Sequence, residues 1–199
     1  MRIVPILLAF STSLFASAPA LAESAAVGKP APDFELTDTT GKTHKLSALK
    51  GKTVVLEWTN PGCPFVKKHV KGGTMNKIMA ANSDVVFLAI NSTNKGHQDY
   101  LTPADYQKWA KENNITHPQL YDADGKVGTA YGAKTTPHMY IVDKGGMVVY
   151  AGAMDDKAMP MGDPANAENY VAAALKALAA GQSPNPAQTK PYGCSVKYE

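Results

Sequence analysis

The chain has 199 residues, a hydrophobic content of 44% and a formal net charge of +3. That length is enough for one domain with a buried core, and it calls for no second domain. Because the basic residues are scattered rather than clustered, the charge argues against nucleic acid as a partner.

Residues 1–22 have the pattern of a cleaved secretory signal. Arg2 precedes an apolar stretch that ends in Ala20-Leu21-Ala22, the small-residue pattern that signal peptidase cuts. The apolar part is shorter than the about 20 residues that a bilayer span needs, and no later segment is long enough either. The sequence therefore predicts cleavage after Ala22 and export to a bacterial periplasm, with no membrane insertion and, since no cysteine lies near the cut, no lipid anchor.

Short segments rich in Val, Ile and aromatic residues predict β-strands at residues 53–58, 84–91, 139–143 and 147–152. Lys144-Gly145-Gly146 predicts a tight antiparallel hairpin between the last two. Helical patterns occupy residues 63–82, with a kink at Gly72-Gly73, and then residues 103–114 and 167–181. The order of strands and helices predicts an α/β fold with a mixed sheet.

The predicted domain covers residues 23–181, and residues 182–199 form a polar, proline-rich tail without periodicity. The tail carries Cys194, one of only two cysteines in the chain. Two cysteines are too few for a disulfide scaffold, so they form either one structural bond or a redox pair.

The other cysteine, Cys63, stands where a buried-type strand ends and a helix begins. It follows Pro61-Gly62 and precedes Pro64, which suits the first position of a helix. Backbone N–H groups and the helix dipole at such a position favour the thiolate, which is the nucleophilic form. Lys67, four residues on, is expected to add a positive charge on the same helix face.

Three stretches, "GKPAPDFELTD" (28–38), "VVLEWTNPGCP" (54–64) and "TTPHMYIVDKGG" (135–146), together resemble the thioredoxin superfamily and its redoxin branch, the AhpC/TSA or peroxiredoxin-like proteins. The resemblance implies a thioredoxin-like fold, with a central mixed sheet flanked by helices. It also implies a cis-proline at Pro137 that faces the reactive sulfur, and a substrate site lined by Pro64, Thr136, Pro137 and His138. Glu57 falls where thioredoxins keep a buried acid, which makes it a candidate proton shuttle.

The sequence also departs from these relatives. The second cysteine of the thioredoxin C-x-x-C motif is replaced by Val66, so no vicinal disulfide can form. The peroxiredoxin signature P-x-x-x-[TS]-x-x-C has Leu56 and Asn60 in place of the Pro and the Thr or Ser. The arginine that holds peroxide in that family has no counterpart after residue 22, and Lys67 could supply its charge but not its planar donor geometry.

The ending "TKPYGCSVKY" resembles that of a redoxin subgroup with one active-site cysteine. It implies that Cys194 resolves an oxidised Cys63, within one chain or across a homodimer. We therefore expect a periplasmic thiol–disulfide oxidoreductase that reduces peroxides or protein disulfides and needs no cofactor or metal. A thiol reductant, such as a membrane electron transporter, is expected to reduce its disulfide again after each cycle.

Other interpretations remain open from the sequence. The two cysteines could form a permanent bond that ties the tail down. The protein could be a disulfide reductase without peroxidase activity. A third alternative is a Cu(I)-binding module, in which the soft ligands Met154, Met159 and Met161 join Cys63 and His138.

Overall fold

A computed structural model describes residues 24–198, so the predicted signal segment lies outside the described residues. Its centre is a five-stranded sheet in the order β5-β4-β3-β7-β8. The strands are β3 (Val54–Trp58), β4 (Val86–Asn91), β5 (Gln119–Tyr121), β7 (His138–Val142) and β8 (Val148–Gly152). β3, β4 and β5 run parallel, whereas β7 pairs antiparallel with both β3 and β8. The predicted mixed α/β sheet of the thioredoxin-like fold is confirmed.

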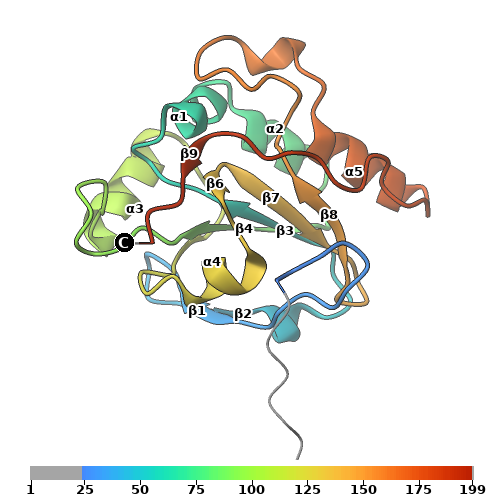
Figure 1. Ribbon diagram of the computed structural model, residues 1–199, viewed down its shortest axis with the longest axis horizontal. Helices are drawn as coiled ribbons and strands as arrows, with labels where there is room; N and C mark the ends of the chain where they lie inside the picture. Colours follow the sequence, from blue (N-terminus) through green and yellow to red (C-terminus); the bar gives the residue numbers. More distant parts are fainter. Residues whose placement is uncertain (1–23, 199) are drawn as a thin grey trace, which may run out of the picture.

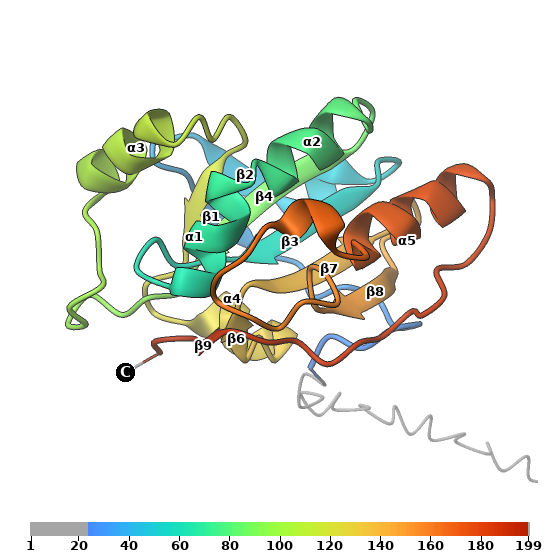
Figure 2. The ribbon, with the colours of Figure 1, turned by 90° about the horizontal axis from the view of Figure 1, so that it is seen from above.

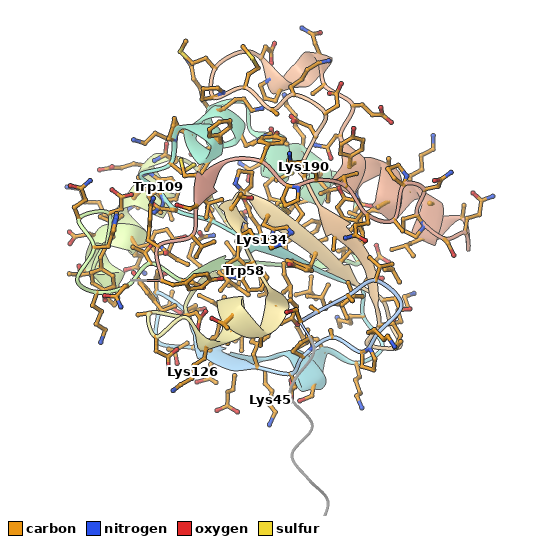
Figure 3. The ribbon with its side chains drawn as sticks, in the orientation of Figure 1. Lys45, Trp58, Trp109, Lys126, Lys134 and Lys190 are labelled. Atoms are coloured by element: carbon orange, nitrogen blue, oxygen red, sulfur yellow. The ribbon has the colours of Figure 1, made fainter. Side chains whose placement is uncertain are left out.

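Alternation along β3 sends its side chains to two separate cores. Val54, Leu56 and Trp58 pack on the face covered by α4 (Lys126–Tyr131) and by the segment before β3. Val55 packs on the opposite face, under α2 (Thr74–Ala80) and α5 (Tyr170–Ala179). Figure 1 shows α4 on one side of the sheet and α2 and α5 on the other. In Figure 3 Trp58 lies at the centre of the molecule, with Lys45 and Lys126 at its rim.

The predicted helix over residues 63–82 is divided in two. α1 (Pro64–Lys71) ends at Gly72, and Gly73, with φ +61°, is the N-cap of α2. A left-handed backbone angle is easily adopted by glycine, which explains why the chain breaks where two glycines meet. α3 (Pro103–Glu112) begins as expected, because the Thr102 hydroxyl accepts a hydrogen bond from the Asp105 backbone N–H.

Several short elements have no counterpart among the predicted ones. The hairpin β1 (Glu35–Thr37) and β2 (Thr43–Lys45) leads into a 3-10 turn, η1 (Leu46–Leu49), ahead of β3. A second 3-10 turn, η2 (Pro164–Asn166), precedes α5. Within residues 24–198 no helix is both long and apolar enough to cross a bilayer.

The tail is an ordered part of the fold. It first runs beside β8, where the Ala151 N–H donates to the Ala187 carbonyl and the Thr189 N–H to the Ala151 carbonyl. Its strand β9 (Cys194–Ser195) then pairs antiparallel with β6 (Thr135–Thr136). Figures 1 and 2 show this red segment crossing from α5 to β6, close to the start of α1. Backbone pairing therefore brings the second cysteine to the first.

Candidate active site at Cys63 and Cys194

The turn between β3 and α1 fixes the position of Cys63. The Asn60 side chain accepts a hydrogen bond from the Gly62 N–H at 2.7 Å, and the Cys63 N–H donates to the Asn60 carbonyl. Cys63 is the N-cap of α1, with extended backbone angles, so its sulfur lies at the N-terminus of the helix. The residue is only 2% exposed.

The two cysteine sulfurs lie 2.8 Å apart, and both residues are free thiols. A disulfide needs an S–S distance of about 2.05 Å, so a movement of less than about 1 Å would close the bond. Thr136 lies opposite Cys194 in the β6–β9 pair, and its carbonyl accepts a hydrogen bond from the Cys63 thiol at 3.0 Å. One chain therefore supplies both thiols.

The two thiols differ in acidity. Burial opposes ionisation of Cys63, but hydrogen bonds from Cys194, the Thr136 side chain and the Val66 N–H outweigh it and lower the Cys63 pKa. Burial and the neighbouring Cys63 raise the pKa of Cys194 to about 12. Cys63 is therefore the thiol that ionises more readily, and Cys194 is the one that holds its proton more tightly. The thiolate is the nucleophilic form of cysteine.

The segment that faces the sulfurs contains the predicted cis-proline. The Thr136–Pro137 peptide bond is cis, and both residues are buried. The Thr136 hydroxyl is buried and makes no hydrogen bond to the described residues, and its proximity to the Cys63 sulfur helps to lower the Cys63 pKa. A β-carbon on Gly193, whose φ is +135°, would lie 2.0 Å from the Thr136 carbonyl oxygen, so this close approach of the tail requires glycine.

His138 is positioned to hold this segment in place. Its Nδ1 accepts a hydrogen bond from the Lys134 N–H, and its ring centroid lies 4.6 Å from that of Tyr140. Burial lowers its pKa to about 4, so the ring is neutral at pH 7. These contacts assign His138 a packing role beside the site.

Lys67 lies on the solvent-facing side of α1. Its side chain is exposed, and its ammonium makes no ion pair or side-chain hydrogen bond within residues 24–198. With Pro64, which is also exposed, it lines an open depression between α1 and residues 160–164. The effect of the Lys67 charge on the Cys63 thiolate, four residues away, stays a prediction.

Glu57 lies inside the protein, as its match to the buried acid of thioredoxins implied. It is 7% exposed, and burial raises its pKa to about 7. Its carboxylate lies 3.9 Å from the Nε2 atom of His117, whose Nδ1 has no partner among the described residues. Glu57, His117 and His69 line a cavity of about 30 Å³, room for about one or two water molecules. The carboxyl group can thus exchange a proton near neutral pH.

Glu57→Gln is expected to change how stability depends on pH. Below about pH 4.5 Glu57 is protonated in both the folded and the unfolded chain, so it contributes nothing. As the pH rises to about 7, the unfolded chain ionises first, and the wild type loses up to about 3 kcal/mol relative to the variant. Urea unfolding of both proteins across this pH range measures the difference between their free energies of unfolding. The buried histidines titrate in both proteins, so their contribution cancels in this difference. A difference that does not change with pH would contradict the raised pKa.

A second polar cluster, which the sequence analysis missed, lies beside α1. It joins Lys68 and His69 of α1 to Asp155 and to Tyr192 of the tail. The Lys68 and Asp155 side chains are 2% and 1% exposed. The spacing of Val66, His69 and Val70 could have indicated that His69 faces inward, but nothing in the sequence marked Lys68 as buried.

The three methionines of the copper alternative have different environments. Met154 is fully buried in the core under α5. Met159 and Met161 are 63% and 80% exposed on the loop before η2. The three therefore do not gather as one soft-metal site with Cys63.

Known proteins resemble this chain in sequence and in fold. A family model described as the AhpC/TSA family matches residues 27–151. The thiol-disulfide oxidoreductase ResA of Geobacillus thermodenitrificans is 30% identical over 125 residues, which cover 62% of this chain and 67% of that protein. The thiol:disulfide interchange protein DsbE of Yersinia pestis is 30% identical over 147 residues, covering 70% and 71%. An uncharacterized conserved protein from Geobacillus kaustophilus has a similar crystal structure, with a TM-score of 0.74, 33% identity and coverage of 87% and 93%.

Proposed function

The chain belongs to the AhpC/TSA family of oxidoreductases, and from this premise we propose that it is an exported, peroxiredoxin-like thiol–disulfide oxidoreductase in which Cys63 is the nucleophile and Cys194 the resolving thiol. The observation that carries the proposal is the 2.8 Å separation of the two sulfurs at the start of α1. The opposite shifts of their pKa values support the assignment of roles.

With a peroxide as oxidant, the Cys63 thiolate attacks one oxygen and the O–O bond breaks. Cys63 becomes a sulfenic acid, and the departing alkoxide or hydroxide takes up a proton. The Cys194 sulfur then attacks the sulfenic sulfur, the S–O bond breaks, and the oxygen leaves as water while the Cys63–Cys194 disulfide forms. A dithiol reductant returns two electrons and two protons to the pair.

Oxidation of Cys63 makes the Cys194 thiol easier to ionise, which favours its attack on Cys63. The charge on Cys63 is one of the causes that raise the Cys194 pKa. A sulfenic acid or mixed disulfide at Cys63 is neutral, so this cause disappears and Cys194 ionises more readily. Burial still raises the Cys194 pKa, but the resolving thiol is more reactive after the first step than before it.

Glu57, Thr136 and Pro137 have supporting roles in this proposal. The Thr136 hydroxyl stabilises the thiolate, and the cis-proline segment holds Cys194 opposite Cys63. Glu57, with its pKa near neutrality, is the candidate proton shuttle. Pro64 starts the helix whose N-terminus favours the thiolate.

A disulfide reductase without peroxidase activity is the second candidate. Residues 24–198 contain no arginine, so this part of the chain offers no guanidinium to orient a peroxide. Two relatives of this chain are themselves named for thiol–disulfide chemistry. With a disulfide substrate, Cys63 forms a mixed disulfide and releases one thiol, and attack by Cys194 releases the second.

The proposed location is the periplasm, on the strength of the signal pattern at residues 1–22. An oxidising compartment requires a dedicated thiol reductant, for which a membrane electron transporter with a thioredoxin-like domain is suited. Because one chain holds both cysteines, a monomer is sufficient for the reaction cycle.

One experiment tests the function and separates the two candidates. Fully reduced protein is mixed with equimolar hydrogen peroxide or with an oxidised model peptide, and the cysteine peptides are followed by mass spectrometry. We expect a Cys63–Cys194 disulfide to form much faster than a free thiol reacts, and Cys63→Ser to abolish the reaction. Fast closure with the peptide but not with peroxide favours the reductase, and slow closure with both would overturn the proposed function.

A further inference from the structure

The side chain of Tyr192, a residue of the tail, lies in the buried polar cluster beside α1. Its hydroxyl donates a hydrogen bond to Asp155, and it lies 3.1 Å from the Nε2 atom of His69 and 3.3 Å from the Nζ atom of Lys68. The ring centroid lies 5.8 Å from that of Phe65, and the Lys68 ammonium lies 5.1 Å from the centre of the Tyr192 ring. Four residues thus contact one tail side chain, three of them from α1.

The Tyr192 hydroxyl completes the hydrogen bonding of the charged groups in this cluster. Lys68 and Asp155 are an almost fully buried pair with 3.6 Å between Nζ and Oδ1. Lys68 also donates to the Lys157 carbonyl at 2.7 Å, whereas Asp155 Oδ2 has no hydrogen-bond partner among the described residues. Buried charges need their remaining hydrogen bonds to be satisfied, and hydrogen bonds to charged groups are the strong ones. Withdrawing the phenol would leave Asp155 with fewer donors in a site that water barely reaches.

Helix α1 links this cluster to the nucleophile. Cys63 is the N-cap of the helix, and Lys68 and His69 lie in its second half. On the tail, Gly193 alone separates Tyr192 from Cys194, and it is pressed against the Thr136 carbonyl so closely that no side chain would fit. A phenol held by α1 therefore determines where the Cys194 sulfur lies relative to Cys63.

We propose that Tyr192 is a positioning residue for the redox pair: the buried Lys68–Asp155–His69 cluster binds its hydroxyl and thereby holds the Cys194 sulfur against Cys63. This inference rests on the proposed function, since it assumes that the two cysteines form a disulfide. It assigns the cluster a role in the chemistry although none of its members contacts either sulfur.

Other contacts keep the rest of the tail in place when this one is lost. The Tyr198 hydroxyl donates to the Ala133 carbonyl at 2.7 Å, and the Val196 N–H donates to the Lys134 carbonyl. Upstream, the Thr189 hydroxyl accepts a hydrogen bond from the Ala153 N–H. Loss of the Tyr192 hydroxyl should thus loosen residues 190–194 without detaching the tail, so the disulfide should become weaker but still form.

The test is the equilibrium between the Cys63–Cys194 disulfide and glutathione, measured on the full chain. Two glutathione thiols reduce the protein disulfide and leave as one glutathione disulfide, so the equilibrium constant is the effective concentration of Cys194 at Cys63. Tyr192→Phe keeps the ring and removes the hydroxyl. We expect a fall of about tenfold to a hundredfold, the range for a lost hydrogen bond to a charged group.

Tyr131→Phe is the matched control, because its buried hydroxyl donates to the Pro32 carbonyl and not to the cluster. It should lower stability without changing the effective concentration. An effective concentration within twofold of wild type in both Tyr192→Phe and Tyr192→Ala would overturn the positioning role and leave the proposed function intact. If the wild type itself forms no Cys63–Cys194 disulfide, the proposed function fails first.

Discussion

Cys194→Ser is expected to stop turnover with a thiol reductant, by at least about 100-fold, while Cys63 still reacts once with its oxidant. Turnover needs a second thiol 2.8 Å from Cys63, and a solution thiol lacks that proximity. Serine keeps a hydroxyl that can donate a hydrogen bond to the thiolate, so the first step should proceed at close to its normal rate. The product to detect is a lasting sulfenic acid on Cys63, trapped with a dimedone reagent and located by mass spectrometry.

Ser195→Ala is the control for this substitution. Ser195 shares β9 with Cys194, but within residues 24–198 its exposed hydroxyl accepts a hydrogen bond from the Lys197 ammonium and from no other side chain, so the variant should turn over like the wild type. A Cys194→Ser protein that turns over normally would show that Cys194 is not the resolving thiol. The pair would then be a structural bond or a chance contact.

Asp155→Ala is expected to lower the free energy of unfolding by about 3–5 kcal/mol, because it leaves the Lys68 ammonium buried and unpaired. The double variant Lys68→Met with Asp155→Ala removes both charges, and it should recover a large part of that loss. Urea unfolding of the wild type, the single variants and the double variant gives the coupling free energy between the two residues.

Asp124→Ala provides the matched surface comparison. Asp124 pairs with Lys126 at 2.7 Å, but their side chains are 58% and 83% exposed. Solvent screening makes such an exposed pair contribute far less to stability than a buried one. If Asp155→Ala cost no more than Asp124→Ala, water would have to reach the Lys68–Asp155 pair, and the basis for a firmly held Tyr192 would be lost.

The reactive half of the site could be predicted from local sequence. Pro61-Gly62 and Pro64 mark a turn followed by a helix start, and a cysteine between them must lie at the helix N-terminus. The match of Glu57 and Pro137 to family positions located a buried acid and a cis-proline, both of which the structure contains. The four-residue spacing singled out Lys67, which is exposed, whereas the buried lysine of α1 is its neighbour Lys68.

Hydrophobic pattern by itself predicted the longer strands and helices, since alternation and helical periodicity reflect which face of each element is buried. The three-residue strands β1, β2 and β5 are too short to show such a pattern. Only the tertiary structure decided where the tail lies. The tail pairs with β6 through backbone groups, which every residue carries, so no pattern of side chains predicts this pairing. Likewise, Lys68 and Asp155 are ordinary surface residue types, and they are buried here because α1, the loop before α5 and Tyr192 close over them. Such burial depends on contacts between residues more than 80 positions apart, which local sequence does not encode.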